Sequence, residues 1–115
     1  MKLKSLALFL LLICAGWYPV FSQCPIIPLP SSYQEQPGSL VLGALKRIVV
    51  HEERLDGVGR FLQQQLLVHK GLTLLESRNG TKDRAVTIDL QPGIAAEGYH
   101  MTVAASGVHI VASDP

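Results

Sequence analysis

The chain has 115 residues, of which 48% are hydrophobic and 17% charged, and its formal net charge is +1. This length allows one domain at most, and the nearly neutral charge gives no support to nucleic-acid binding. The sequence contains no internal repeat and no low-complexity segment.

The first 22 residues have the pattern of a secretory signal peptide. Lys2 and Lys4 precede an apolar stretch, residues 5–15, which is shorter than a transmembrane helix. Cleavage after Ser22 would leave Gln23 at the N-terminus and eight Lys and Arg against nine Asp and Glu, a net charge of −1. We therefore expect a secreted or periplasmic protein whose mature domain, residues 23–115, has no transmembrane segment. The alternative is that the stretch stays uncut as a membrane anchor.

Only one cysteine would remain after this cleavage. Cys14 would be removed, so Cys24 could form no intramolecular disulfide. Lipidation of Cys24 would need small residues before it, and Phe21 fits that requirement poorly. We favour a free thiol at Cys24 and a domain that is stabilised by its hydrophobic core alone.

The first half of the domain predicts an extended segment, two strands and a helix. Prolines stiffen residues 25–30, and residues 40–42 and 47–52 have the composition of strands. Apolar residues then recur at helical spacing, which predicts a helix over residues 56–70. The residues in this pattern are Leu55, Val58, Leu62 and Leu66, with Phe61 on the flank. Asp56 is its expected N-cap, and Gly71 its expected C-terminal glycine.

The second half predicts four strands, over residues 72–76, 85–90, 98–105 and 108–112. Asn79-Gly80 predicts a turn, and Ser106-Gly107 predicts a hairpin between the last two strands. The order of elements indicates an α+β fold, with a single, mostly antiparallel sheet and a helix layer on one face. Ser113-Asp114-Pro115 has the pattern of a helix start, so the fold as given lacks its C-terminal helix.

No residue pattern indicates a metal site. A zinc protease needs His-Glu-x-x-His on a helix, but residues 51–55 read HEERL, with Leu55 in the second histidine position. His69 lies in the last turn of the predicted helix, where its positive form suits the helix dipole. His100 and His109 could face each other across the hairpin, but two histidines without a third ligand make a weak site.

Catalytic and cofactor patterns are missing as well. The sequence has no Gly-x-Ser-x-Gly, and Gly57-x-Gly59 is too short to be a phosphate-binding loop. Asn79-Gly80-Thr81 fits a glycosylation sequon, although we favour a simple turn. We therefore assign no catalytic residue, no cofactor and no metal ligand. The sequence predicts a domain without chemistry of its own.

Four segments together resemble the N-terminal domain of the bacterial-type β-N-acetylhexosaminidases of glycoside hydrolase family 20. They are residues 26–42 (IIPLPSSYQEQPGSLVL), the helix end HKGLTL, residues 97–103 (EGYHMTV) and residues 107–115 (GVHIVASDP). The resemblance covers about residues 25–115 in order and spacing. It implies an accessory domain that packs in cis against a catalytic (β/α)₈ barrel.

In that family the barrel removes terminal N-acetylglucosamine or N-acetylgalactosamine from glycans. The acetamido oxygen of the substrate attacks the anomeric carbon, and an Asp-Glu pair of the barrel assists. No position of this sequence matches that pair, so the chain alone is not expected to be active. The resemblance implies that a helix and the barrel follow residue 115. We therefore interpret the chain as an incomplete piece of a longer enzyme. We expect this piece in isolation to be marginally stable or prone to aggregation.

Two alternatives remain open at this stage. The related O-GlcNAc hydrolases carry a similar domain, and the sequence beyond residue 115 would separate the two. A stand-alone secreted module that binds carbohydrate or protein is the other. Sugar sites need exposed aromatic side chains, and the mature chain offers only Tyr33, Phe61 and Tyr99, of which we expect Phe61 to lie in the core.

Overall fold

The computed structural model describes Ile26 and residues 29–115. The predicted signal peptide, its cleavage site and Cys24 lie outside these residues. The chain divides into two units, residues 1–35 and 36–115. In the first unit the described residues form no helix or strand, and Leu29 and Tyr33 are exposed.

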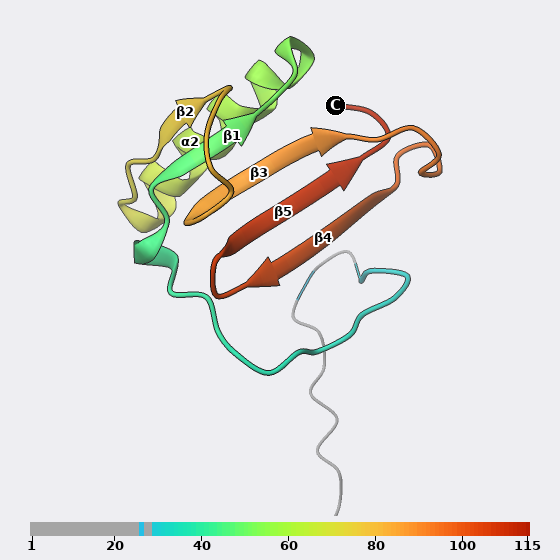
Figure 1. The fold of residues 1–115 in the computed structure, drawn as a ribbon, viewed down its shortest axis with the longest axis horizontal. Helices are drawn as coiled ribbons and strands as arrows, with labels where there is room; N and C mark the ends of the chain where they lie inside the picture. The colour runs from blue at the N-terminus through green and yellow to red at the C-terminus, as the bar shows by residue number, and fades with distance from the viewer. Residues whose placement is uncertain (1–25, 27–28) are drawn as a thin grey trace, which may run out of the picture. The chain divides into compact units, whose positions relative to one another are not determined.

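The second unit consists of a five-stranded sheet, one α-helix and two short 3-10 helices. Along the chain they are η2 (Leu42–Ala44), β1 (Arg47–Val50), η3 (Glu53–Leu55), α2 (Asp56–Lys70), β2 (Leu75–Ser77), β3 (Ala85–Leu90), β4 (Tyr99–Ala104) and β5 (Gly107–Ala112). The helix lies on one face of the sheet, where its main contacts are with β1 and β2 (Figure 1). This arrangement is the predicted α+β class.

The sheet is mixed, so the prediction of a mostly antiparallel sheet is wrong. The strand order is β2-β1-β3-β5-β4, and only the β4–β5 hairpin is antiparallel. The pairs β1–β2, β1–β3 and β3–β5 are all parallel. Helix α2 carries the chain back along the sheet between β1 and β2, which is the usual connection between parallel neighbours. The hairpin turn dictates only the pairing of β4 with β5.

Helix α2 has the predicted bounds, Asp56–Lys70, and it ends as predicted. Gly71 has φ 65°, a left-handed conformation, and its N–H donates to the carbonyl oxygens of Leu66 and Leu67. The start differs from the prediction by one residue, because Leu55 occupies the N-cap position and no side chain caps the helix. The preceding turn, η3, leads directly into the helix, so Asp56 already has helical dihedral angles.

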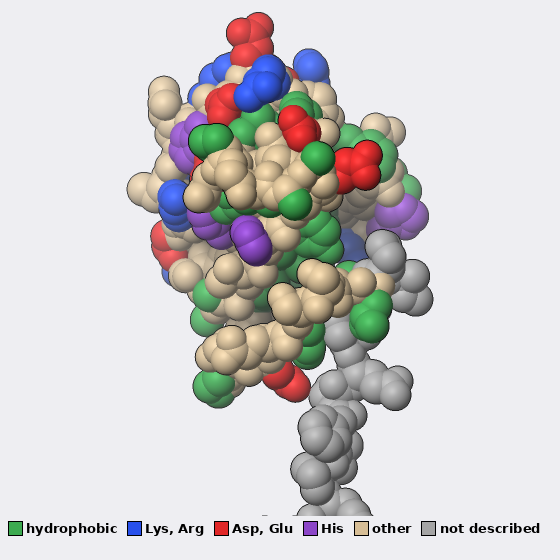
Figure 2. Space-filling model, turned by 90° about the vertical axis from the view of Figure 1, so that its right-hand side faces the viewer, with side chains coloured by type: hydrophobic (Ala, Val, Ile, Leu, Met, Phe, Trp, Pro, Cys, Tyr) green, Lys and Arg blue, Asp and Glu red, His purple; other side chains and the backbone are tan. Residues whose placement is uncertain are grey.

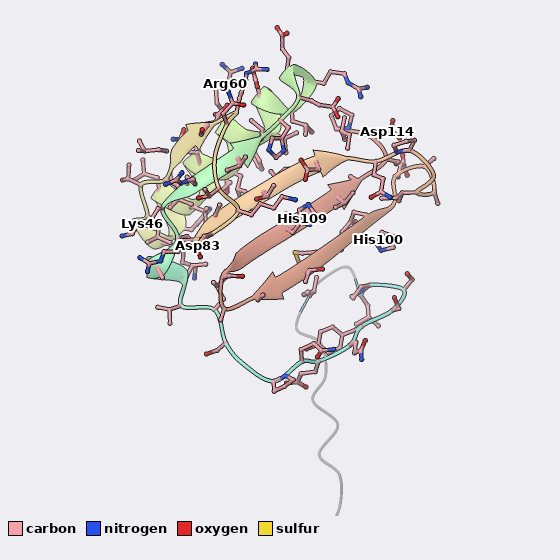
Figure 3. All side chains as sticks on the ribbon, in the orientation of Figure 1. Lys46, Arg60, Asp83, His100, His109 and Asp114 are labelled. Carbon is pink, nitrogen blue, oxygen red and sulfur yellow. The ribbon has the colours of Figure 1, made fainter. Side chains whose placement is uncertain are left out.

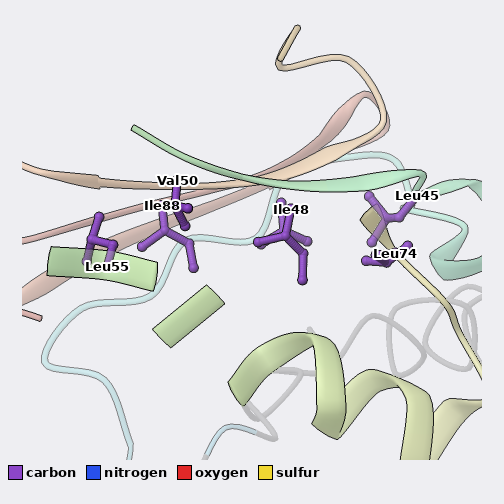
Figure 4. Packing of buried hydrophobic residues seen from close by; sticks show 7 residues of the cluster. Leu45, Ile48, Val50, Leu55, Leu74 and Ile88 are labelled. Carbon is purple, nitrogen blue, oxygen red and sulfur yellow. The ribbon is translucent and has the colours of Figure 1, made fainter. Parts of the chain in front are cut away.

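The hydrophobic core lies between α2 and one face of β1 and β3. Leu45, Ile48, Val50, Leu55, Leu74, Val86 and Ile88 form its buried cluster (Figure 4). Val58, Leu62 and Leu66 pack against it from the helix, as their spacing predicted. Phe61 is 63% exposed, so its expected place in the core is wrong.

The predicted and observed bounds of a strand agree best where apolar residues alternate over a long stretch of sequence. The prediction for β3 is confirmed residue by residue, and the hairpin turn at Ala105-Ser106 joins β4 and β5 close to the predicted bounds. The predicted strand over residues 40–42 is wrong, because the chain there enters η2. Strand β1 ends at Val50 rather than at Glu52, and β2 starts at Leu75 rather than at Leu72. No helix among the described residues is long and apolar enough to cross a membrane.

Candidate functional site

The sheet face opposite α2, here called the outer face, carries the polar side chains of the central strands. Paired residues share a face, so the register places Val49, Thr87, His109 and Thr102 in one row across four strands. A second row on the same face contains the small residues Ala85, Gly107 and Ala104. Residues 78–84, between β2 and β3, cross in front of β1 at this face (Figure 1).

Asp89 is the centre of a polar cluster at the end of β3. Nδ1 of His51 lies 2.5 Å from its Oδ1, and Nε2 of His109 lies 2.8 Å from its Oδ2. Lys82 adds a more distant ion pair, with Nζ 3.9 Å from Oδ2. His51 follows β1 and His109 belongs to β5, so one carboxylate connects the side chains of three neighbouring strands. We call His51, Asp89 and His109 the carboxylate cluster.

Two opposing effects act on the pKa of Asp89. Partial burial raises the pKa, because it disfavours the charged carboxylate. The hydrogen bonds and charges of His51 and His109 lower the pKa by more, so the net change is downward. Asp89 is therefore ionised at neutral pH, and both of its oxygens are engaged.

The predicted pairing of His100 with His109 is wrong. Thr102 lies opposite His109, while His100 lies opposite Val111, one pair further along the same face. Figure 3 shows His109 on β5 and His100 on β4. His109 contacts Asp89 instead. His69 lies in the last turn of α2 as predicted and contacts Oε1 of Gln65 at 3.1 Å.

The carboxylate cluster does not have the geometry of a nucleophilic site. Catalysis by a serine or cysteine needs an imidazole that contacts the nucleophile and a carboxylate that orients the imidazole. Among the described residues, the side-chain hydrogen bonds of His51 and His109 go to Asp89 and to no hydroxyl or thiol. Within residues 29–115 no group of three or more His, Cys, Asp or Glu is arranged to hold a metal ion. The arrangement supports strand-to-strand attachment.

The face of the sheet that carries α2, here called the helix-side face, has an uncovered half. Tyr99, Met101 and Val103 of β4 lie on this face, because their partners Ala112, Ile110 and Val108 do. Their exposed fractions are 49%, 41% and 52%. Helix α2 packs over β1 and β2 at the other side of the sheet, so it leaves β4 open (Figure 1). Figure 2 shows the molecule from the side that is on the right in Figure 1, where hydrophobic side chains lie at the surface among polar side chains and histidines.

A protein-family comparison assigns this fold. The model of glycosyl hydrolase family 20, domain 2, matches residues 23–115, which is most of the chain. The chain belongs to glycosyl hydrolase family 20. The resemblance of the four sequence segments to the N-terminal domain of family 20 hexosaminidases is thereby confirmed.

A solved structure supports the same fold for the family 20 domain. The crystal structure of an inactive mutant of the GH20 exo-β-N-acetylglucosaminidase from Vibrio harveyi matches with a TM-score of 0.50 and 17% sequence identity. The match covers 75% of this chain and 16% of that chain. The family 20 domain therefore corresponds in length to a small part of that enzyme. No curated protein sequence matches.

The carboxylate cluster is the feature of the family 20 domain that the sequence analysis missed. Asp89 carried no signal beyond its place in the alternating stretch AVTIDL, which puts it on the same face as Thr87. His51 and His109 meet it only because β1, β3 and β5 are parallel neighbours. An antiparallel sheet, which the sequence analysis favoured, would have different neighbours.

Proposed function

We propose that this chain is the N-terminal accessory domain of a secreted enzyme that removes terminal N-acetylglucosamine or N-acetylgalactosamine from glycans. Membership of family 20 supports the enzyme class. The structural match covers only 16% of an exo-β-N-acetylglucosaminidase chain. This share fits a domain that precedes a larger catalytic part. The chemistry would belong to that part, because no position of this sequence matches the Asp-Glu pair of the family.

The role that we propose for the domain is structural support of a catalytic (β/α)₈ barrel in the same chain. The observation that supports this role is that the apolar side chains of β4 on the helix-side face are exposed, so they offer a surface that the rest of the parent enzyme, a helix and the barrel behind it, would cover. Soluble domains rarely leave contiguous apolar side chains open to water, and such patches mark contact surfaces. The sequence Ser113-Asp114-Pro115 suits the start of a helix, and a helix that continues from there would cover Met101 and Val103.

In the parent enzyme the barrel would supply catalysis by the substrate-assisted route. The acetamido oxygen of the substrate would attack the anomeric carbon, and an Asp-Glu pair of the barrel would orient the acetamido group and protonate the leaving oxygen. No residue of this chain is assigned to that reaction. The domain would act on activity only through the stability and solubility of the whole enzyme.

The test begins with the nucleotide sequence after the codon for Pro115. An open frame that encodes a helix and several hundred further residues with an Asp-Glu pair is the expected result. The encoded enzyme should release 4-nitrophenol from 4-nitrophenyl N-acetyl-β-glucosaminide, and the chain of 115 residues alone should not. A stop codon directly after Pro115 would contradict the proposal.

A matched pair of variants in that enzyme tests the role of β4. Val103→Lys should lower the soluble yield and the melting temperature, because it places a charge at the proposed contact. Leu75→Lys is the control, since Leu75 is 72% exposed and lies on the outer face, opposite Arg47. Equal effects of the two substitutions would argue against a covered helix-side face.

A further inference from the structure

The loop between β2 and β3, residues 78–84, passes in front of β1 on the outer face (Figure 1). Its first residue is attached to α2, because Nη2 of Arg78 lies 2.6 Å from Oδ2 of Asp56. The next two residues, Asn79 and Gly80, belong to no helix or strand. Among the residues that the structure describes, no backbone hydrogen bond of a loop or turn involves either of them. Asn79 is exposed, so its side-chain amide is open to water.

The close approach of this loop to β1 requires a glycine at position 80. A Cβ there would lie 2.9 Å from Cγ2 of Val49 and 3.2 Å from Cδ of Arg47. Atoms of β1 would have to move to admit any side chain at Gly80. Val49 is fully buried even though it lies on the outer face, and the loop that covers it reaches it through this glycine. The fold therefore keeps Asn79 directly before a glycine.

An exposed asparagine before a glycine is open to reaction with its own backbone. The backbone nitrogen of the glycine attacks Cγ of the asparagine, and a five-membered succinimide ring closes. The amide nitrogen leaves as ammonia together with the proton of the attacking N–H. Water then opens the ring at either carbonyl, which gives aspartate or isoaspartate. Glycine favours the attack because it has no side chain and adopts many backbone conformations, and asparagine is among the thermolabile residues of proteins.

We propose that Asn79 is a site of spontaneous deamidation in the folded protein, where the side chain of Asn79 reacts with the backbone nitrogen of Gly80. Water is the only co-reactant, so the reaction needs no cofactor and no enzyme. Asn79 is the one asparagine among the 115 residues, so the loss of its amide can be followed without interference from a second asparagine of this domain. The site lies outside the proposed enzymatic role and does not depend on it.

The two products should affect the loop differently. Aspartate at position 79 adds a negative charge near Arg47, since a Cβ at the neighbouring Gly80 would lie 3.6 Å from Nη1 of Arg47. Isoaspartate carries the same charge, but its main chain runs through the side-chain methylene and is one atom longer. The extra atom lies directly before the glycine that packs on Val49. Isoaspartate should therefore displace the loop from β1, whereas aspartate should leave it in place.

The test measures the loss of the amide in the full-length folded protein during incubation at mildly alkaline pH. Endoproteinase Lys-C releases the peptide of residues 71–82, because Lys70 and Lys82 mark its ends, and the mass of this peptide should rise by one unit with time. A synthetic peptide of the same residues provides the unfolded reference, and the folded protein should react at a rate of the same order. A folded protein that keeps its amide while the synthetic peptide loses it would overturn the proposal. So would a glycan on Asn79, which would block the amide and make use of the sequon Asn79-Gly80-Thr81.

Two variants of the same protein locate the effect. Asn79→Gln should keep its mass over the same period, because glutamine would have to close a six-membered ring, which forms more slowly. Fresh Asn79→Asp supplies the aspartate product without isoaspartate, so it should melt at the same temperature as the fresh wild type. The aged wild type should melt at a lower temperature and be methylated by protein isoaspartyl methyltransferase. An aged wild type without isoaspartate, or an Asn79→Gln variant that gains mass as fast as the wild type, would overturn the assignment.

Discussion

Nε2 of His109 lies 2.8 Å from Oδ2 of Asp89, although the two residues are 20 positions apart in the sequence. They belong to β5 and β3, which are parallel neighbours, and the second oxygen of the same carboxylate contacts His51 beyond the end of β1. One ionised side chain thus connects three strands on the outer face. This connection complements the apolar core on the opposite face.

Replacing Asp89 with Asn should lower the free energy of unfolding at pH 7 by about 1 kcal/mol. The substitution removes the charge that both imidazoles contact, and partial solvent exposure limits the effect. Urea denaturation of the full-length protein measures it. Asp83→Asn is the control, because Asp83 is exposed and its ion pair with Arg84 spans 4.0 Å. If Asp83→Asn lowered the free energy of unfolding as much as Asp89→Asn does, the proposed stabilising role of Asp89 would be contradicted.

The contribution of Asp89 should depend on pH in a defined direction. The pKa of Asp89 is lower in the folded chain than its ordinary value of 3.8, so the folded state holds the proton less tightly than the unfolded state. Its stabilisation is therefore fully present above about pH 4 to 5 and is lost as the pH falls through the folded pKa. Urea midpoints of wild type and Asp89→Asn should approach each other as the pH falls below the ordinary pKa of 3.8 and through the lower folded pKa. A gap that stays constant as the pH falls below 3.8 would contradict this assignment.

Ile48→Ala should be among the most destabilising single substitutions in the domain. Ile48 is fully buried in the cluster beneath α2, and truncation leaves a cavity that costs about 2–5 kcal/mol. Leu75→Ala, at an exposed position of β2, should change the free energy of unfolding by less than about 0.5 kcal/mol. Thermal denaturation of both variants measures this difference. Similar losses of stability in the two variants would contradict the position of the core beneath α2.

Replacing a glycine with alanine should change the stability in opposite directions at Gly71, which follows α2, and at Gly57, which lies within it. Gly71→Ala forces a side chain into a left-handed conformation and should cost about 1 kcal/mol. Gly57→Ala lies in the first turn, where a Cβ meets nothing within 4 Å, so it should be neutral or stabilise by a few tenths of a kcal/mol. Melting temperatures measured together decide the sign of each. Stabilisation by Gly71→Ala would contradict the observed helix end.

The mature protein should begin at Gln23. The basic and apolar pattern of residues 1–22 predicts a cleaved signal peptide. Intact-mass spectrometry of the protein from the extracellular or periplasmic fraction of its host measures the new N-terminus. A mass that retains residues 1–22 would favour a membrane anchor, and a lipid adduct on Cys24 would indicate a lipoprotein.

The sequence by itself determined helix α2 and strand β3, and it indicated the family of this domain. The spacing of Leu55, Val58, Leu62 and Leu66, with Gly71 behind them, determined the helix, because an apolar stripe and a left-handed glycine act within one element. Four segments in order were enough to indicate family 20, which the family match confirmed. These are short-range signals that can be read from residue types alone.

Only the tertiary structure decided the sheet order and the carboxylate cluster. Strand pairing depends on contacts between residues far apart in the sequence, and alternation along one strand is the same for a parallel and an antiparallel neighbour. In the observed strand order, β3 lies between β1 and β5. His51 and His109 therefore lie on either side of Asp89 and contact its carboxylate. The same register sets Gly107 beside Ala85, where a Cβ would lie 2.5 Å from the carbonyl oxygen of Ala85, so only glycine fits there.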